Sequence, residues 1–348
     1  MTARPLIALL AAGAVTAACS SGSAHGARTP APSPSVAASP SPSPTAAPSP
    51  AALGLSPGVD PLTGVGPRPP GPLVVIKVDN AVTARPYQRG LGRAAIVYQE
   101  LVEAGETRFA AVFSVASPGE VGPVRSVRES DIELLRQYGK VPVAFSGGNS
   151  GVKATFQRAV SAGYLIDASY DAVPQDYRIG ERRVDAYNFF TVPSELAASR
   201  PGVAAHDVGL RFGPLPPGAG TAVTAARAVF SPYVTVRLDY VPATGHYAIF
   251  EDQHEVGGVG PANIVIQRVP VHLSRYVDVL GNPTPYTVST GSGPVTVLRD
   301  GRAVTGRWQR PTAADGTRFV NGTGQDIPLR PGPTWVLLLP TSGSLTLS

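Results

Sequence analysis

The sequence predicts an α/β mixed fold, in which an N-terminal mixed sheet with helices is followed by a smaller β-rich C-terminal domain. Long apolar runs such as 72–80 and 107–116 are typical of buried strands. Helical patterns follow them at about 127–138 and 151–161. Beyond residue 222 the chain consists mainly of short β-branched runs separated by glycine, which favours strands over helices.

Residues 1–18 predict a lipoprotein signal peptide. Arg4 precedes an apolar stretch of about 13 residues, which is too short to span a membrane. Small residues come directly before Cys19, as in a bacterial lipobox, although Thr16 stands where a branched aliphatic residue is usual. Cys19 is the only cysteine and cannot form an internal disulfide, so we expect it to be lipidated. The alternative is an ordinary signal peptide cut nearby, with Cys19 an incidental thiol.

Residues 19–58 predict a disordered linker. They are almost entirely serine, alanine, proline, glycine and threonine, and this composition cannot form a core. Proline at this density favours extended polyproline II, so about 40 residues reach roughly 100 Å. Such a spacer would lift a folded domain away from a membrane.

The composition argues against several kinds of partner. The net charge of +5 is spread along a chain with 15% charged residues, which speaks against nucleic acid as a partner. The five histidines show no metal-binding spacing. We therefore predict no nucleic acid, no metal and no cofactor.

The folded part predicts two domains. Residues 59–212 show the order β-β-β-α-β-α, with the second and third strands (94–103 and 107–116) forming a hairpin. Residues 222–342 form the β-rich domain, in which Asp300 and Gly301 indicate a two-residue hairpin turn.

Two arginines stand at the predicted start of the first helix. Ser126 and Glu129 have the spacing of a capping box, which predicts that a helix begins at about residue 127. Arg125 and Arg128 flank this serine, where a cation opposes the helix dipole unless an anion lies nearby. For the second helix, Ser150 is the predicted N-cap.

Polar side chains follow the predicted strands at their carboxyl ends, where open α/β sheets bind ligands. Arginine is suited to carboxylate and phosphate groups. The predicted ligand-binding residues are Asp79, Asn80, Arg85, Glu103, Arg108, Arg125, Ser126, Arg128, Asn149 and Asn188. A competing interpretation is a buried ion network, in which the arginines at 108, 125 and 128 pair with Asp79, Glu100 and Glu103.

Several motifs resemble those of the YerB-like lipoproteins, a bacterial envelope family with a domain of unknown function. They are "VDN…ARP…GL", "VYQELVEAGETRF", "VGPVRSVR", "SGGNS" and "AYNFF", with "GHYAIFEDQH", "ANIVIQ", "GRWQRP" and "PGPTWVLLLP" further on. The chain departs from the family pattern at Gln99, where an acid is usual, and at Ala186 and Tyr187, where Pro-His precedes Asn188. The resemblance implies a mature chain beginning at Cys19 and anchored by acyl chains on the outer face of the cytoplasmic membrane. It implies no reaction.

Three functions remain open from the sequence. The first is binding of an anionic wall component, such as a peptide carboxylate or wall polymer, or of an envelope protein. The second is a cell-wall hydrolase that uses Asp79 or Glu103 as general acid or base. The third is an envelope scaffold. Ser150 and Lys153 match S-x-x-K, but no K-T-G follows and capping explains the serine better, so no catalytic residue is predicted.

Overall fold

The computed structural model describes residues 58–66, 72–114, 117, 119–180, 188–258 and 260–348. The predicted signal peptide, Cys19 and the linker up to residue 57 lie outside these ranges. Within them, no helix is both long and apolar enough to cross a membrane.

The described residues form mostly strands. The three α-helices found there are α1 (Glu129–Leu135), α2 (Ser150–Ser161) and α3 (Pro193–Ser199). The strands of the N-terminal half are β1 (Val74–Asp79), β2 (Ile96–Leu101), β3 (Thr107–Phe113), β4 (Val121–Val124), β5 (Val141–Ala144), β6 (Leu165–Asp167), β7 (Tyr177–Ile179) and β8 (Phe189–Thr191). Those of the C-terminal half are β9 (Thr221–Ala222), β10 (Ala225–Val229), β11 (Thr235–Val241), β12 (His246–Glu251), β13 (His254–Glu255), β14 (Asn263–Val269), β15 (Val271–Val277), β16 (Pro283–Thr287), β17 (Gly291–Arg299), β18 (Arg302–Arg310), β19 (Arg318–Val320), β20 (Thr334–Pro340) and β21 (Ser344–Leu347).

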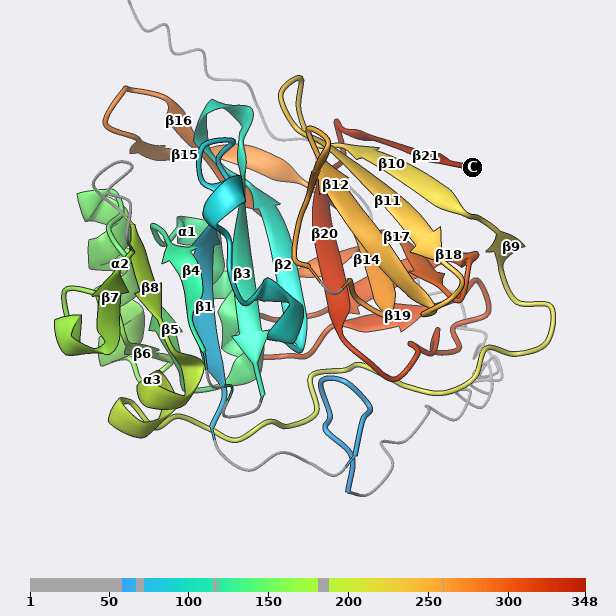
Figure 1. The fold of residues 1–348 in the computed structure, drawn as a ribbon, viewed down its shortest axis with the longest axis horizontal. Helices are drawn as coiled ribbons and strands as arrows, with labels where there is room; N and C mark the ends of the chain where they lie inside the picture. The colour runs from blue at the N-terminus through green and yellow to red at the C-terminus, as the bar shows by residue number, and fades with distance from the viewer. Residues whose placement is uncertain (1–57, 67–71, 115–116, 118, 181–187, 259) are drawn as a thin grey trace, which may run out of the picture. The chain divides into compact units, whose positions relative to one another are not determined.

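One large mixed sheet contains strands from both halves of the sequence (Figure 1). Its main path runs β19-β18-β17-β14-β20-β2-β3-β1-β4-β8-β7, with β5 paired to β1 and β6 to β5. The joining strand is β20, which pairs in parallel with β2 on one side and β14 on the other. All seven residues of β20 are buried, as expected of a central strand.

Two apolar clusters cover the two faces of this sheet. Alternate residues of a strand point to opposite faces, so Val75 belongs to one cluster while Val74 and Ile76 belong to the other. The Val75 side is packed by α1 and α2, through residues such as Phe156. The opposite side is packed by α3 and by a second, five-stranded sheet in the order β13-β12-β11-β10-β21. Figure 1 shows this second sheet in front of β14 and β17.

The predicted fold class is wrong. Strands make up 42% of the structure and helices 15%, so the fold is β-rich with several sheets instead of an α/β mixed arrangement. The error has a physical reason: the two predicted helices are present as α1 and α2, but these short helices cover only part of one sheet face. Strands of the C-terminal half cover most of the other face of the large sheet. The order of elements in the N-terminal half contains no information about this packing.

The predicted helix starts also need correction. Helix α1 begins at Glu129, and its N-cap is Arg128. The carboxylate of Asp131, not of Glu129, bonds back to the backbone N–H of Arg128 at 2.7 Å. The N-cap of α2 is Asn149, whose Oδ1 accepts from the N–H groups of Gly151 and Val152, and not Ser150. Ser126 is therefore free of a capping role.

Two predicted hairpins are confirmed. Strands β2 and β3 pair antiparallel, with Glu100 opposite Arg108. Strands β17 and β18 are joined at Asp300 and Gly301, both of which have positive φ, as a tight two-residue turn requires.

Candidate functional site

The candidate site lies where several strands of the large sheet end. Asp79 is the last residue of β1, Glu103 follows β2, and Arg108 is the second residue of β3. Arg125 and Arg128 lie in the short segment between β4 and α1. The antiparallel register places Asp79 directly opposite Arg108. Chain topology therefore brings these five residues together from four separate segments.

These five residues form what we call the arginine cluster: Asp79, Glu103, Arg108, Arg125 and Arg128. Asp79 Oδ2 lies 2.9 Å from Arg125 Nε, and its Oδ1 lies 3.3 Å from an Arg108 terminal nitrogen. Glu103 Oε2 lies 2.6 Å from a terminal nitrogen of Arg128. The ion network that the sequence offered as a competing interpretation is present here, with Glu100 paired elsewhere.

The cluster contains more cationic groups than carboxylates. The Nε atoms of Arg108 and Arg128 are buried without a hydrogen-bond acceptor. Burial lowers the pKa of Arg128 to about 10, and the positive charge of Arg108 adds to this effect, although Glu103 opposes it. Two guanidinium groups are therefore held close together, and each has a buried N–H group without an acceptor. A bound anion would accept these hydrogen bonds and offset the repulsion between the two charges.

Glu106 lies next to the cluster and is half-buried. Burial raises the pKa of its carboxyl group. Arg108 opposes this shift, while the negative charge of Asp79 reinforces it. The carboxyl group of Glu106 therefore carries a proton more readily than an exposed glutamate does.

A buried lysine supports the start of α1. Lys77 Nζ contacts Glu100 Oε1 at 2.6 Å and Asp131 Oδ1 at 2.5 Å, and all three side chains are buried. Burial and the charge of Glu100 raise the pKa of Asp131 to about 7. Burial would also raise the pKa of Glu100, but Lys77 and the hydroxyl of Ser130 more than offset it. This network holds the segment that carries Arg128.

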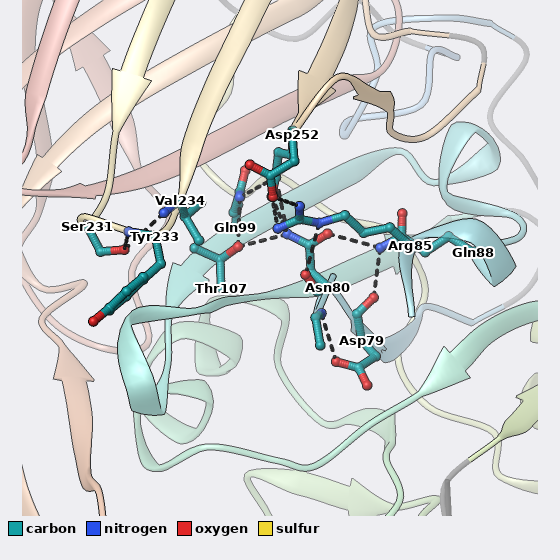
Figure 2. A network of polar contacts seen from close by, with 12 residues as sticks. Asp79, Asn80, Arg85, Gln88, Gln99, Thr107, Ser231, Tyr233, Val234 and Asp252 are labelled. Carbon is teal, nitrogen blue, oxygen red and sulfur yellow. Dashed lines mark hydrogen bonds and ion pairs between the residues drawn. The ribbon is translucent and has the colours of Figure 1, made fainter. Parts of the chain in front are cut away.

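A second polar network contains Asn80 and Arg85 (Figure 2). Its centre is the buried carboxylate of Glu251, which accepts from Asn80 Nδ2, from Gln99 Nε2 at 2.7 Å and from Arg85 at 2.9 Å. Thr107 Oγ1 accepts from Asn80 Nδ2 at 2.7 Å and from Gln99 Nε2 at 3.0 Å. Arg85 also pairs with Asp252. Asn80 and Arg85 therefore connect the two halves of the chain through Glu251.

The sequence prediction missed Glu251, although a signal for it exists. Tyr247, Ile249 and Glu251 alternate along β12 and share its buried face. A charged residue on the apolar side of an alternating strand indicates a buried carboxylate with internal partners. Gln99 of β2 is one of those partners, since its Nε2 donates to the carboxylate of Glu251.

A two-stranded ribbon, β15 and β16, covers this end of the sheet (Figure 1). Thr284 on the ribbon donates to Glu103 Oε1 at 2.8 Å, so both oxygens of Glu103 are engaged. Tyr276 lies 3.0 Å from Thr155 Oγ1, and Asn149 donates to the carbonyl of Val277 at 2.7 Å. Asn149 thus fixes the ribbon and caps α2, and it does not point to a shared site with the arginines.

The two remaining predicted residues are Ser126 and Asn188. Ser126 is half-buried between Arg125 and Val127. Asn188 comes just before β8, and its carbonyl accepts from the N–H of Gly180 at 2.9 Å. Among the described residues, no group of three or more His, Cys, Asp or Glu side chains is arranged to hold a metal ion.

Comparison with known proteins gives matches along most of the folded part. A family model described as "Protein of unknown function (DUF3048) N-terminal domain" matches residues 62–205, and the model of the corresponding C-terminal domain matches residues 226–336. "Putative lipoprotein YerB" of Bacillus subtilis (strain 168) is 37% identical over 98 residues. That match spans 28% of this chain and 29% of the length of that protein.

The fold has a counterpart among solved structures. The crystal structure of the YerB protein from Bacillus subtilis has a TM-score of 0.67 to this chain at 22% identity, and the match covers 83% of this chain and 99% of that one. At this identity the likeness shows the fold alone. The two matched family regions and the relative named YerB establish that the chain belongs to the YerB-like family.

Proposed function

We propose that the chain is a lipid-anchored protein of the cell envelope that binds an anionic envelope component through the arginine cluster. The observation that carries this proposal is the excess of guanidinium groups, three against two carboxylates, with the Nε atoms of Arg108 and Arg128 buried and unmet. Buried donors of this kind are costly unless an acceptor satisfies them.

The chemistry of the cluster favours a carboxylate or phosphate ligand. The planar guanidinium group presents parallel donors that match the oxygens of either anion. Arg125 is the most accessible of the three, with 24% of its side chain exposed, against 6% for Arg108 and 11% for Arg128. An approaching anion would therefore meet Arg125 first, while the two deeper arginines supply the charge behind it.

The geometry gives less support to hydrolysis by Asp79 or Glu103. The oxygens of Asp79 contact Arg108, Arg125 and the N–H of Ala81. Those of Glu103 contact Arg128 and Thr284. A general acid or base must reach the proton that it transfers. Both carboxylates would first have to leave these partners.

The lipid anchor at Cys19 is part of the proposal. It is supported by the apolar leader before Cys19 and by the similarity to a protein named as a lipoprotein. Metabolic labelling with an alkyne fatty acid should modify the wild-type chain and leave Cys19→Ala unlabelled. Equal labelling of both chains, or no labelling of either, contradicts the anchor.

Anion binding is tested by calorimetry on the mature chain from residue 19, produced with Cys19→Ser so that it carries no lipid. The probes are inorganic phosphate and the wall-type peptide N-acetyl-D-alanyl-D-alanine. At least one should bind, and Arg125→Gln should weaken it about tenfold, the effect of losing one charge-assisted bond. The matched control is Arg237→Gln, an exposed arginine paired with Asp239 on β11. The proposal fails if neither probe binds or if Arg125→Gln and the control behave alike.

A further inference from the structure

A cavity of about 490 Å³ lies at the end of the sheet where β5 and β6 begin. Its walls are largely apolar and include Val160 of α2, Leu165 and Ile166 of β6, and Val203. Figure 1 shows α2, β6 and α3 grouped on this side of the molecule. The volume is within the range of about 300–1,000 Å³ that is usual for small-molecule sites.

Two cationic side chains line the same cavity, Lys140 and Arg200. Within the described part of the chain, neither has a carboxylate partner. The Nε of Arg200 is buried with no hydrogen-bond acceptor, and one terminal nitrogen donates to the carbonyl of Ala172 at 3.3 Å. The cavity thus combines apolar walls with an unmet guanidinium donor.

The acidic residue of the lining does not neutralise these cations. Asp167 Oδ2 accepts from Gln157 Nε2 at 2.5 Å, and its Oδ1 accepts from the N–H of Ser169 at 2.9 Å. Both oxygens are therefore engaged within the fold. The net charge of the lining is positive, with two cations against one carboxylate.

We infer that this cavity binds an anionic amphiphile, a small molecule with an apolar body and one carboxylate or phosphate head. The apolar walls would take up the body, and Arg200 Nε would donate to the head. This site is separate from the arginine cluster, because Lys140 directly precedes β5, whereas the cluster lies at the carboxyl ends of β1 and β2. The inference does not rest on the proposed function.

The test uses calorimetry on the mature Cys19→Ser chain, without detergent. Octanoate and octyl phosphate are the two probes, and octanol is the neutral comparison. At least one anion should bind, more tightly than octanol, and the one that binds better identifies the head group. Arg200→Gln should weaken binding about tenfold.

Two further variants make the result decisive. Val160→Phe should weaken binding of every probe, because the larger ring takes up part of the apolar space that the alkyl chain would occupy. Arg237→Gln should leave binding unchanged, since this exposed arginine pairs with Asp239 on β11 and does not line the cavity. If thermal unfolding shows that Arg200→Gln does not fold, Lys140→Gln takes its place, because Lys140 is exposed. The inference is wrong if neither anion binds, if octanol binds equally well, or if the cation and cavity variants leave affinity unchanged.

Discussion

Arg85 and Glu251 form an ion pair of 2.9 Å in which both side chains are buried, 3% and 1% exposed. Arg85 belongs to the first matched family region and Glu251 to the second. Burial raises the pKa of Glu251 to about 7, although Arg85, Asn80 and Gln99 oppose the shift. The two halves of the chain are thus joined by a carboxyl group that titrates near neutral pH.

The first prediction concerns pH and stability. Because the pKa of Glu251 is raised from 4.5 to about 7, the native state holds its proton over this range while the unfolded chain releases it. The contribution of Glu251 to the free energy of unfolding is complete below pH 4.5. It falls by about 3 kcal/mol as the pH rises through 7. Urea unfolding at pH 5 and pH 8 measures it. The loss should be smaller in Glu251→Gln, where Asp131 still titrates, and an unchanged loss would contradict the assignment.

The second prediction concerns the buried lysine. Lys77→Met leaves the carboxyl groups of Glu100 and Asp131 without their cation in the interior. Breaking a buried ion pair from one side costs about 3–5 kcal/mol, so urea unfolding should show a loss of this size. The matched control is Lys153→Met, whose pair with Asp171 is exposed and should cost less than about 1 kcal/mol. Equal losses in the two variants would show that the buried Lys77 network stabilises the fold no more than the exposed Lys153 pair does.

The third prediction rests on the proposed anion binding. Asp79→Asn removes the negative charge that Arg108 and Arg125 share. Phosphate should then bind about tenfold more tightly, because the freed guanidinium groups can pair with it, whereas the free energy of unfolding should fall. Calorimetry and urea unfolding measure the two effects. Weaker or unchanged phosphate binding would count against the cluster as an anion site, and loss of activity on wall fragments would instead favour the hydrolase hypothesis.

The fourth prediction concerns the contact between α2 and the β15–β16 ribbon. A Cβ added at Gly151 would lie 2.3 Å from Cε1 of Tyr276, so Gly151→Ala must displace the Tyr276 ring from its contact with α2. We expect a loss of about 1–3 kcal/mol, as for other overpacked sites. In a Tyr276→Ala background the same change should be neutral or stabilising, because alanine favours the helix over glycine. A similar loss in both backgrounds would mean that Tyr276 is not the obstacle.

Local patterns predicted the local structure well. The β2–β3 hairpin and the turn at Asp300 and Gly301 were found because their signals come from neighbouring residues. Helix starts were misplaced by one or two residues, since Ser126 and Ser150 satisfy the capping pattern as well as the true caps do. The choice of cap depends on which side chain the surrounding fold holds in place, as Lys77 does for Asp131.

The sequence by itself determined the family, most strands and the set of polar residues at the strand ends, because apolar periodicity and motif order are properties of the chain alone. Only the tertiary structure decided which charges meet. The pairing of Asp79 with Arg125, and of Arg85 with Glu251, depends on strand register and on β20 joining both halves in one sheet. Contacts between residues far apart in the sequence leave no local pattern, and the β-rich fold class could not be predicted from the sequence for the same reason.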